Sequence, residues 1–215
     1  PPPSFQAEDG IRDLVLSLVG SEMCIRDSHR IVSSESEELI LVDRNDREIG
    51  SVSKADAHDG DGVLHRAFSL FLFNDDGELL LQQRAPGKRL WGGYWSNSCC
   101  SHPRLGESLE VATRRRLCDE LNFETALEHI YWFCYQASFD ASGSEHELCH
   151  VYLGRASDDV QANDSEIAAV RYLSPAALDA EFEAAPGRFT PWFRQEWQEL
   201  KGRYREQLER YCTLA

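Results

Sequence analysis

Lysine is scarce in this sequence: only three of its 22 basic residues are lysine, and the rest are arginine. Acidic residues number 37, so the formal net charge is −15. Such a charge argues against a surface that attracts nucleic acid non-specifically. An acidic, lysine-poor composition is typical of adaptation to high salt, but a GC-rich genome that favours arginine explains it at least as well.

Long apolar runs and a regular cysteine framework are also missing. No stretch reaches the roughly 18 consecutive apolar residues of a membrane-spanning helix, so we expect none. The seven cysteines are an odd number at irregular spacings, which indicates a reducing compartment, the cytoplasm. The 215 residues, 42% hydrophobic and 27% charged, fit one globular domain with a sizeable core.

The first 38 residues differ in pattern from the rest. Their one apolar stretch, residues 11–20, is short, contains Asp13 and lacks a basic start, so it makes a poor signal peptide. The tripeptide Ile11-Arg12-Asp13 recurs at residues 25–27, which suggests a non-native extension, and a helix packed on the domain is the alternative. We therefore divide the chain into an extension over 1–38, non-native or disordered, and a domain over 39–215. The first 34 residues should be dispensable.

After residue 38, short apolar segments separated by Gly/Asp/Asn turns predict strands in hairpins, each group followed by a single helix. A first hairpin is expected from strands 39–42 and 48–52, and a second from strands 67–73 and 78–84. Further strands are expected over 130–139, 145–154 and 168–173, and helices over 109–121, 175–185 and 192–208. This order is typical of an α/β domain with a mixed sheet.

The chemically most distinctive stretch is 91–120, and its centre reads Trp95-Ser96-Asn97-Ser98-Cys99-Cys100-Ser101-His102-Pro103. The Cys100 thiol comes two residues before the His102 imidazole. A thiol can move a proton, and an imidazole can move one or bind a metal. Ser108 can cap the helix expected over 109–121, and a loop that leads into a helix is a natural place for such groups and for an anion.

These residues resemble those of the type I isopentenyl-diphosphate isomerases, metal-dependent enzymes on a Nudix-type scaffold. The Asn-Ser-x-Cys-x-His-Pro run of that family corresponds to residues 97–103, and the resemblance extends over about residues 39–197. The Nudix box is decayed, as it is in that family, which argues against a standard Nudix hydrolase. Three box residues agree, Glu107, Arg115 and Glu120, whereas Ser101 and Asn122 replace glycines and Arg116 replaces a glutamate.

The resemblance implies an α/β fold, a Nudix-type α/β/α sandwich with a mixed β-sheet and an added N-terminal hairpin. It also implies that the chain isomerises isopentenyl diphosphate to dimethylallyl diphosphate in isoprenoid biosynthesis. The reaction would add a proton at one carbon and remove one two carbons away, through a carbocation-like state. We expect a small-molecule isoprenoid diphosphate as the substrate, no nucleic-acid or membrane partner, and a monomer.

Several histidines and glutamates are candidate metal ligands. A lone histidine is usually hydrogen-bonded or on the surface, and Glu-x-Glu on a strand is often a solvated face, although residues two apart do share one face. The resemblance implies one divalent ion, because the family has metal ligands at all the matching positions. Three imidazoles and two carboxylates suit Mg²⁺ or Mn²⁺, and Zn²⁺ could also bind. The implied ligands are His58, His65, His102, Glu145 and Glu147, with no role for His29, His129, His146 or His150.

Proton transfer is assigned through the resemblance to Cys100 and Glu147, assisted by a hydrogen bond from Tyr135. Glu147 would then be both a metal ligand and a proton carrier. Cys99 matches a usually apolar position and is expected to pack in the core. Without the motif, a buried cysteine is ordinarily a small core residue, and a redox pair of the two adjacent cysteines is a minor alternative.

At the diphosphate end, the resemblance implies that Glu120 helps to hold a second ion, a Mg²⁺ that enters with the diphosphate. Replacing a box carboxylate by Arg116 favours holding a diphosphate over hydrolysing it. The plain alternative for residues 114–116 is a solvated helix face, expected for Arg114, while Arg115 pairs with Glu107. Four basic residues match family positions that hold the diphosphate: Lys54, Arg84, Lys88 and Arg116.

Trp192 matches a family tryptophan that lies over the reacting carbons. The commoner outcome for an aromatic residue that follows Pro191 is a core side chain at the start of a helix. An indole face would, however, attract the developing cation more than the neutral alkene.

Two other functions fit parts of the sequence. A Nudix diphosphate hydrolase would release phosphate and give no isomerised product. A non-catalytic metal-binding scaffold on the Nudix fold would bind metal without turnover, but it would have no need to combine Cys100 with Glu147 and Tyr135.

Overall fold

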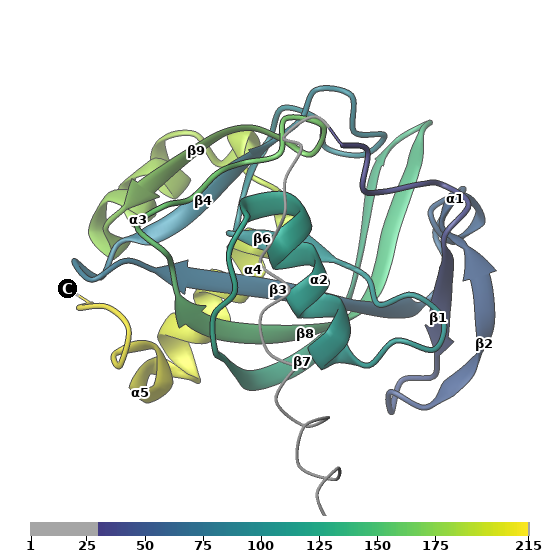
Figure 1. Ribbon diagram of the computed structural model, residues 1–215. Coiled ribbons are helices and arrows are strands. Elements are labelled where there is room, and N and C mark those ends of the chain that lie inside the picture. Colours follow the sequence, from purple (N-terminus) through teal and green to yellow (C-terminus); the bar gives the residue numbers. More distant parts are fainter. Residues whose placement is uncertain (1–29, 215) are drawn as a thin grey trace, which may run out of the picture.

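A computed structural model describes residues 30–214, in which nine strands form one mixed sheet (Figure 1). The order of strands and helices follows the order expected from the sequence. The strands are β1 (Glu38–Val42), β2 (Glu48–Ser53), β3 (His65–Phe73), β4 (Leu79–Arg84), β5 (Trp95–Ser96), β6 (Cys99–Ser101), β7 (Leu127–Asp140), β8 (Gly143–Arg155) and β9 (Ile167–Leu173). The helices are α1 (Lys54–Ala57), α2 (Leu109–Leu121), α3 (Pro175–Ala184), the 3₁₀ turn η1 (Pro186–Arg188), α4 (Pro191–Gly202) and α5 (Arg205–Leu208).

Strand β3 is the hub of the sheet. It pairs antiparallel with β1, β4 and β6 and parallel with β8, which in turn pairs antiparallel with β7. Strand β9 pairs antiparallel with β4. The N-terminal hairpin of β1 and β2 forms at the end of the main path, as the sequence predicted.

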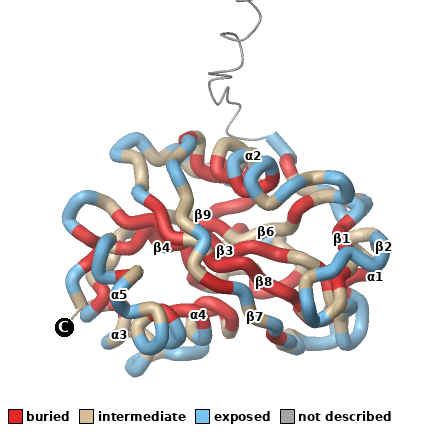
Figure 2. The backbone as a smooth tube through the Cα atoms, turned by 90° about the horizontal axis from the view of Figure 1, so that it is seen from below, coloured by how far each residue is buried: buried red, intermediate tan, exposed pale blue. Residues whose placement is uncertain are grey.

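Two hydrophobic clusters cover the two faces of the sheet, and the alternation of β3 divides its side chains between them. Phe71 and Phe73 join the cluster that includes Trp197 and Leu200 of α4, whereas Phe68, Leu70 and Leu72 join the cluster of α2. Figure 2 shows the buried strands between α2 on one side and α3, α4 and α5 on the other. The α/β/α sandwich expected from the resemblance is therefore confirmed.

Helix α2 has the predicted limits. The Ser108 hydroxyl accepts a hydrogen bond from the Val111 amide at 3.2 Å, as an N-cap does. The helix ends at Asn122, whose φ of 68° is left-handed, and the Asn122 amide donates to the Leu117 carbonyl at 3.0 Å. Asparagine tolerates this conformation better than most residues, which explains how Asn122 can stand where the Nudix box has glycine.

The prediction of one helix over 192–208 is wrong, because the chain leaves the helix after Gly202 and resumes it at Arg205. Tyr204 has φ −115° and ψ 29°, and its ring stacks on Tyr131 with centroids 4.5 Å apart. The break also lets Leu208 become fully buried. Aromatic packing and burial here outweigh continuation of the helix.

The part of the N-terminal extension that the structure describes, residues 30–38, contacts the domain. The Val32 carbonyl accepts a hydrogen bond from Arg116 at 3.2 Å, and the Arg30 carbonyl accepts one from the side-chain Nδ2 of Asn163 at 2.9 Å. The division of the chain at residue 38 stays a prediction. The repeated tripeptides, the apolar stretch 11–20 and His29 lie outside the described residues.

None of the helices between residues 30 and 214 is both long enough and apolar enough to span a bilayer.

Candidate active site and metal centre

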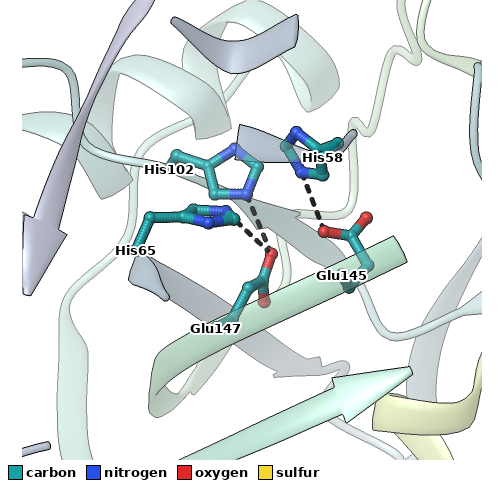
Figure 3. Close-up of side chains that lie close together, drawn as sticks. All are labelled: His58, His65, His102, Glu145 and Glu147. Atoms are coloured by element: carbon teal, nitrogen blue, oxygen red, sulfur yellow. Dashed lines mark hydrogen bonds and ion pairs between the residues drawn. The ribbon is translucent and has the colours of Figure 1, made fainter. Parts of the chain in front are cut away.

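The five side chains expected to bind a metal lie together, and one ligand atom from each falls within 4.8 Å of the others (Figure 3). His58 follows α1, His65 begins β3, and His102 follows β6. Glu145 and Glu147 are two residues apart on β8 and therefore point to one face. The parallel register between β3 and β8 pairs His65 with Glu147, which brings distant parts of the sequence side by side.

Backbone hydrogen bonds orient two of the imidazoles. The Nδ1 atoms of His58 and His65 lie 2.7 Å from the carbonyls of Lys54 and Val63, so their Nε2 atoms face the carboxylates. His58 Nε2 is 2.8 Å from Glu145, and His102 Nε2 is 2.8 Å from Glu147. A backbone carbonyl that holds Nδ1 is the usual outer support of a metal-binding histidine.

The His65 Nε2 atom, 3.9 Å from Glu147 Oε1, is too far from it for a hydrogen bond. His65 is fully buried, and its Nε2 has no hydrogen-bond partner among the described residues. Burial and the charge of His58 lower the pKa of His65 to about 4, and burial followed by the charges of His65 and His58 lowers that of His102. Both rings are therefore neutral, the form that binds metal ions, and the donor set fits a divalent cation.

The two carboxylates of the cluster differ in ionisation. Burial and the neighbouring charge of Glu145 raise the pKa of Glu147 well above its ordinary range. Burial opposes the ionisation of Glu145 as well, but the adjacent His58 outweighs it and holds the pKa of Glu145 at about 2. In this arrangement, Glu147 is the carboxyl group able to carry a proton.

Glu147 also contacts Tyr135, the residue predicted to assist proton transfer. The Tyr135 hydroxyl donates a hydrogen bond to Glu147 Oε2 at 2.7 Å, because the two residues face each other across β7 and β8. Cys100 lines the same cavity, and burial raises the pKa of its thiol to about 12. Cys99 instead is fully buried in the core cluster of α2.

Trp192 is the second residue of α4 and lines the cavity with these groups. It is 3% exposed, its ring lies edge-on to Trp91 at 5.2 Å, and it lies 6.0 Å from the Tyr135 ring. The Arg84 guanidinium is 5.5 Å from the centroid of the Trp192 ring. The indole thus already lies next to a cation, and its Nε1 has no hydrogen-bond partner among the described residues.

The cationic residues assigned to the diphosphate line the same cavity, as does Glu120. Arg116 is almost fully buried, and its donors are engaged by protein groups. Its Nε donates to Glu120 at 2.8 Å, and its NH2 donates to Glu166 at 3.0 Å. Arg115 pairs with Glu107 at 2.7 Å as expected, while Arg114 is largely exposed and pairs with Glu124.

Among the residues that line this cavity, the sequence did not single out Glu166, Ser33 and Glu35, nor Gln82, Arg89 and Leu90. Glu166 lies at the end of a polar loop before β9, where a solvated acidic residue is unremarkable in sequence. Ser33 lies in the stretch that we expected to be dispensable, and its hydroxyl accepts a hydrogen bond from the Lys54 ammonium at 2.5 Å. No local pattern marks either residue, because both reach the site through tertiary contacts.

Comparisons with known proteins identify the family and the fold of the chain. A model of the NUDIX domain matches residues 63–193. The chain is 41% identical over 173 residues to isopentenyl-diphosphate Delta-isomerase 2 of Photorhabdus laumondii, which covers 75% of this chain and 97% of the relative. It is 43% identical over 165 residues to the isopentenyl-diphosphate Delta-isomerase of Halorhodospira halophila, covering 76% and 94%. The crystal structure of DR0079 from Deinococcus radiodurans superposes with a TM-score of 0.58 at 26% identity, covering 69% of this chain and 90% of that one.

Proposed function

The chain belongs to the isopentenyl-diphosphate Delta-isomerase family, with a Nudix domain, and on this premise we propose that it converts isopentenyl diphosphate to dimethylallyl diphosphate. The observation that supports this most directly is one cavity lined by two chemically different groups of side chains. Cys100, Tyr135, Glu147 and Trp192 form the first group, and lysine and arginine side chains form the second. Isomerisation of an alkene attached to a diphosphate needs both, because the first group can move protons at the alkene and the second can bind the diphosphate.

At the reacting end, protonation of an unactivated alkene requires a nearby acid and a site that tolerates a tertiary cation. We infer that Cys100 and the Glu147–Tyr135 pair carry the two protons, one giving a proton to a carbon and the other taking one two carbons away. The 2.7 Å hydrogen bond from Tyr135 fixes the Glu147 carboxyl for this transfer. Trp192 offers its ring face to the cation, and burial keeps out water that would capture it.

We propose that His58, His65, His102, Glu145 and Glu147 hold one divalent ion, Mg²⁺, Mn²⁺ or Zn²⁺. The neutral imidazoles of His65 and His102, and the His65 Nε2 without a hydrogen-bond partner, support this proposal. When bound, the ion supplies positive charge that orients Glu147 and favours its ionised form. We further propose that Glu120 contributes to a second site, for a Mg²⁺ that accompanies the diphosphate.

The diphosphate is held, in this proposal, by Lys54, Arg84, Lys88 and Arg116. These side chains bind the part of the ligand that is the same in substrate and product. Their contribution to the reaction is therefore to place the C5 chain against Cys100 and Trp192, an orientation effect.

One assay tests the proposed function. Purified protein is incubated with Mg²⁺ and isopentenyl diphosphate, and substrate, dimethylallyl diphosphate and inorganic phosphate are measured together. We expect isomerised product without phosphate release. Phosphate in place of the isomer would identify a hydrolase, and metal binding without any product would identify a scaffold.

Two further proposals concern the setting of the enzyme. A cytoplasmic location is supported by the free thiols of Cys99 and Cys100, and it predicts that the thiol oxidant diamide inactivates the protein and that reduction restores its activity. We also propose that the protein is a monomer. Size-exclusion chromatography with light scattering measures the mass directly, and a stable dimer would contradict the proposal.

A further inference from the structure

Glu166 places a carboxylate inside the group of cations assigned to the diphosphate. It is 4% exposed, forms an ion pair with the Lys88 ammonium, and accepts a hydrogen bond from Arg116 NH2 at 3.0 Å. Its backbone is fixed on both sides. The Glu166 amide donates to the Asn163 carbonyl at 3.0 Å, and the Glu166 carbonyl accepts from the Ala85 amide at 2.9 Å. The carboxylate is therefore a built part of the cavity.

Glu120 approaches the same guanidinium from α2. Arg116 NH2 lies 2.5 Å from Glu120 Oε1 and 3.0 Å from Glu166 Oε2. The two carboxylates are also joined through the backbone, because the Asn163 amide donates to the Glu120 carbonyl at 2.8 Å. Burial opposes the ionisation of Glu166, but Arg116 and Lys88 outweigh it and lower its pKa, so its negative charge persists at neutral pH.

A negative charge is unexpected in a cavity that binds an anion. Apart from the proposed metal ligands, five basic side chains and three carboxylates line the cavity, Arg89 and Glu35 among them, which leaves two net positive charges. A diphosphate monoester carries about three negative charges at neutral pH. Without Glu166, three net positive charges would match the bare diphosphate. With Glu166, the cavity is one charge short, and the carboxylate repels phosphate oxygens from Lys88 and Arg116.

We propose that Glu166 is a specificity-determining residue that makes the cavity select a diphosphate carrying a divalent cation over the bare diphosphate. The inference rests on the proposed function only in taking these basic side chains as the diphosphate site. A divalent ion supplies the missing positive charge, and the two carboxylates beside Arg116 favour its approach. Discrimination arises from a repulsive group aimed at the unwanted ligand, a recognised route to specificity.

Glu166→Gln removes the charge and keeps the shape and one acceptor. Inorganic pyrophosphate is titrated calorimetrically into protein whose His/Glu centre has been loaded with Zn²⁺ and desalted, once in Mg²⁺-free buffer and once with saturating Mg²⁺. Wild type should bind far more tightly with Mg²⁺. Glu166→Gln should bind bare pyrophosphate about tenfold more tightly than wild type, a change that corresponds to about 1.4 kcal/mol, and its gain from Mg²⁺ should shrink by a similar factor.

Two variants serve as controls. Glu128→Gln removes an exposed carboxylate that pairs with Arg210, and it should reproduce the wild-type preference. Glu166→Asp keeps the charge with a shorter reach, and it should keep most of the preference for Mg²⁺. If the affinity of Glu166→Gln for pyrophosphate falls equally in both buffers, Glu166 only holds Lys88 and Arg116 in position. If the affinity is unchanged, Glu166 has no effect on pyrophosphate binding. Either result overturns the proposal.

The wild-type measurement keeps the proposal testable if Glu166→Gln fails to fold. Wild type that binds pyrophosphate equally with and without Mg²⁺ would overturn it without any variant. Pyrophosphate binding needs no turnover. Protein that selects the Mg²⁺ complex but does not isomerise isopentenyl diphosphate would therefore refute the proposed function and leave the role of Glu166 standing.

Discussion

Glu196 gives the most sharply defined prediction about stability. It lies on α4, one turn after Trp192, and is fully buried. Its Oε1 lies 3.4 Å from the Cys149 thiol, whereas its Oε2 has no hydrogen-bond partner among the described residues. Burial raises the pKa of Glu196 from its ordinary value of 4.5 to about 7. The carboxyl group is thus neutral in the folded protein at pH 5 and ionises near neutrality.

This shift determines how Glu196 changes stability with pH. Between pH 4.5 and about 7, the unfolded chain has released the proton, but the folded protein still holds it. The free energy of unfolding contributed by this group therefore falls as pH rises through that window and is flat above it. At about 1.4 kcal/mol per pH unit, the window amounts to roughly 3 kcal/mol as an upper limit.

Glu196→Gln removes the titration while keeping the size of the side chain and the acceptor for Cys149. The variant should be more stable than wild type by roughly 2–3 kcal/mol at pH 8, and by much less at pH 5. Urea unfolding followed by tryptophan fluorescence at both values measures the difference. Glu199→Gln, on the exposed side of the same helix, should show no such dependence. A stability difference between Glu196→Gln and wild type that is the same at both pH values would refute the reasoning.

Four further predictions follow from the cavity. Cys100→Ala should abolish nearly all turnover and leave metal binding intact, while Cys99→Ala stays active; equal losses in product-formation assays would contradict the assignment. Exhaustive chelation should abolish activity and Mg²⁺ or Mn²⁺ should restore it, so full activity in the chelated protein would exclude an essential ion. A tertiary-ammonium diphosphate mimics the cation, and Trp192→Leu should raise its dissociation constant roughly tenfold more than it raises the KM for the substrate. Equal increases would show that Trp192 only lines the pocket. A chain starting at Arg30 should keep the melting temperature of the full chain. A chain starting at Glu35 loses the Val32 and Ser33 contacts and should have a lower melting temperature. Equal melting temperatures of the two truncated chains would show that these contacts are dispensable.

The parts of the fold that the sequence predicted correctly depend on local signals. Helix α2 starts at a serine cap and ends at Asn122, and both features are legible within a few residues. The turn that ends at Gly77, with φ 75°, likewise fixes the hairpin of β3 and β4. The break before α5 was missed because it depends on Tyr131, more than 60 residues away in sequence.

The candidate metal ligands, in contrast, are not marked by local signals in the sequence. Nothing near His65 in sequence indicates Glu147, and only the parallel pairing of β3 with β8 brings the two together. The residues alone could not separate this set from His129 and His150, which the structure joins to each other at 3.1 Å on the sheet. His150 also lies 3.0 Å from Asp46, so this second pair is hydrogen-bonded within the fold. The family resemblance supplied the ligand set that spacing could not.

Arg84 is the basic side chain of the cavity that also contacts the proposed reacting groups. The Leu90 carbonyl accepts hydrogen bonds from its Nε and NH2 at 3.3 and 3.1 Å, and these bonds hold the guanidinium in place. From there, NH1 lies 3.9 Å from the Cys100 sulfur, and the guanidinium carbon lies over the Trp192 ring. Diphosphate binding is the same in the substrate and in the transition state, so by itself it cannot lower the barrier of the chemical step. In the proposed binding mode, however, a phosphate that docks on Arg84 would meet a cation already fixed against the thiol and the indole, so the binding energy of the diphosphate would position the reacting carbons.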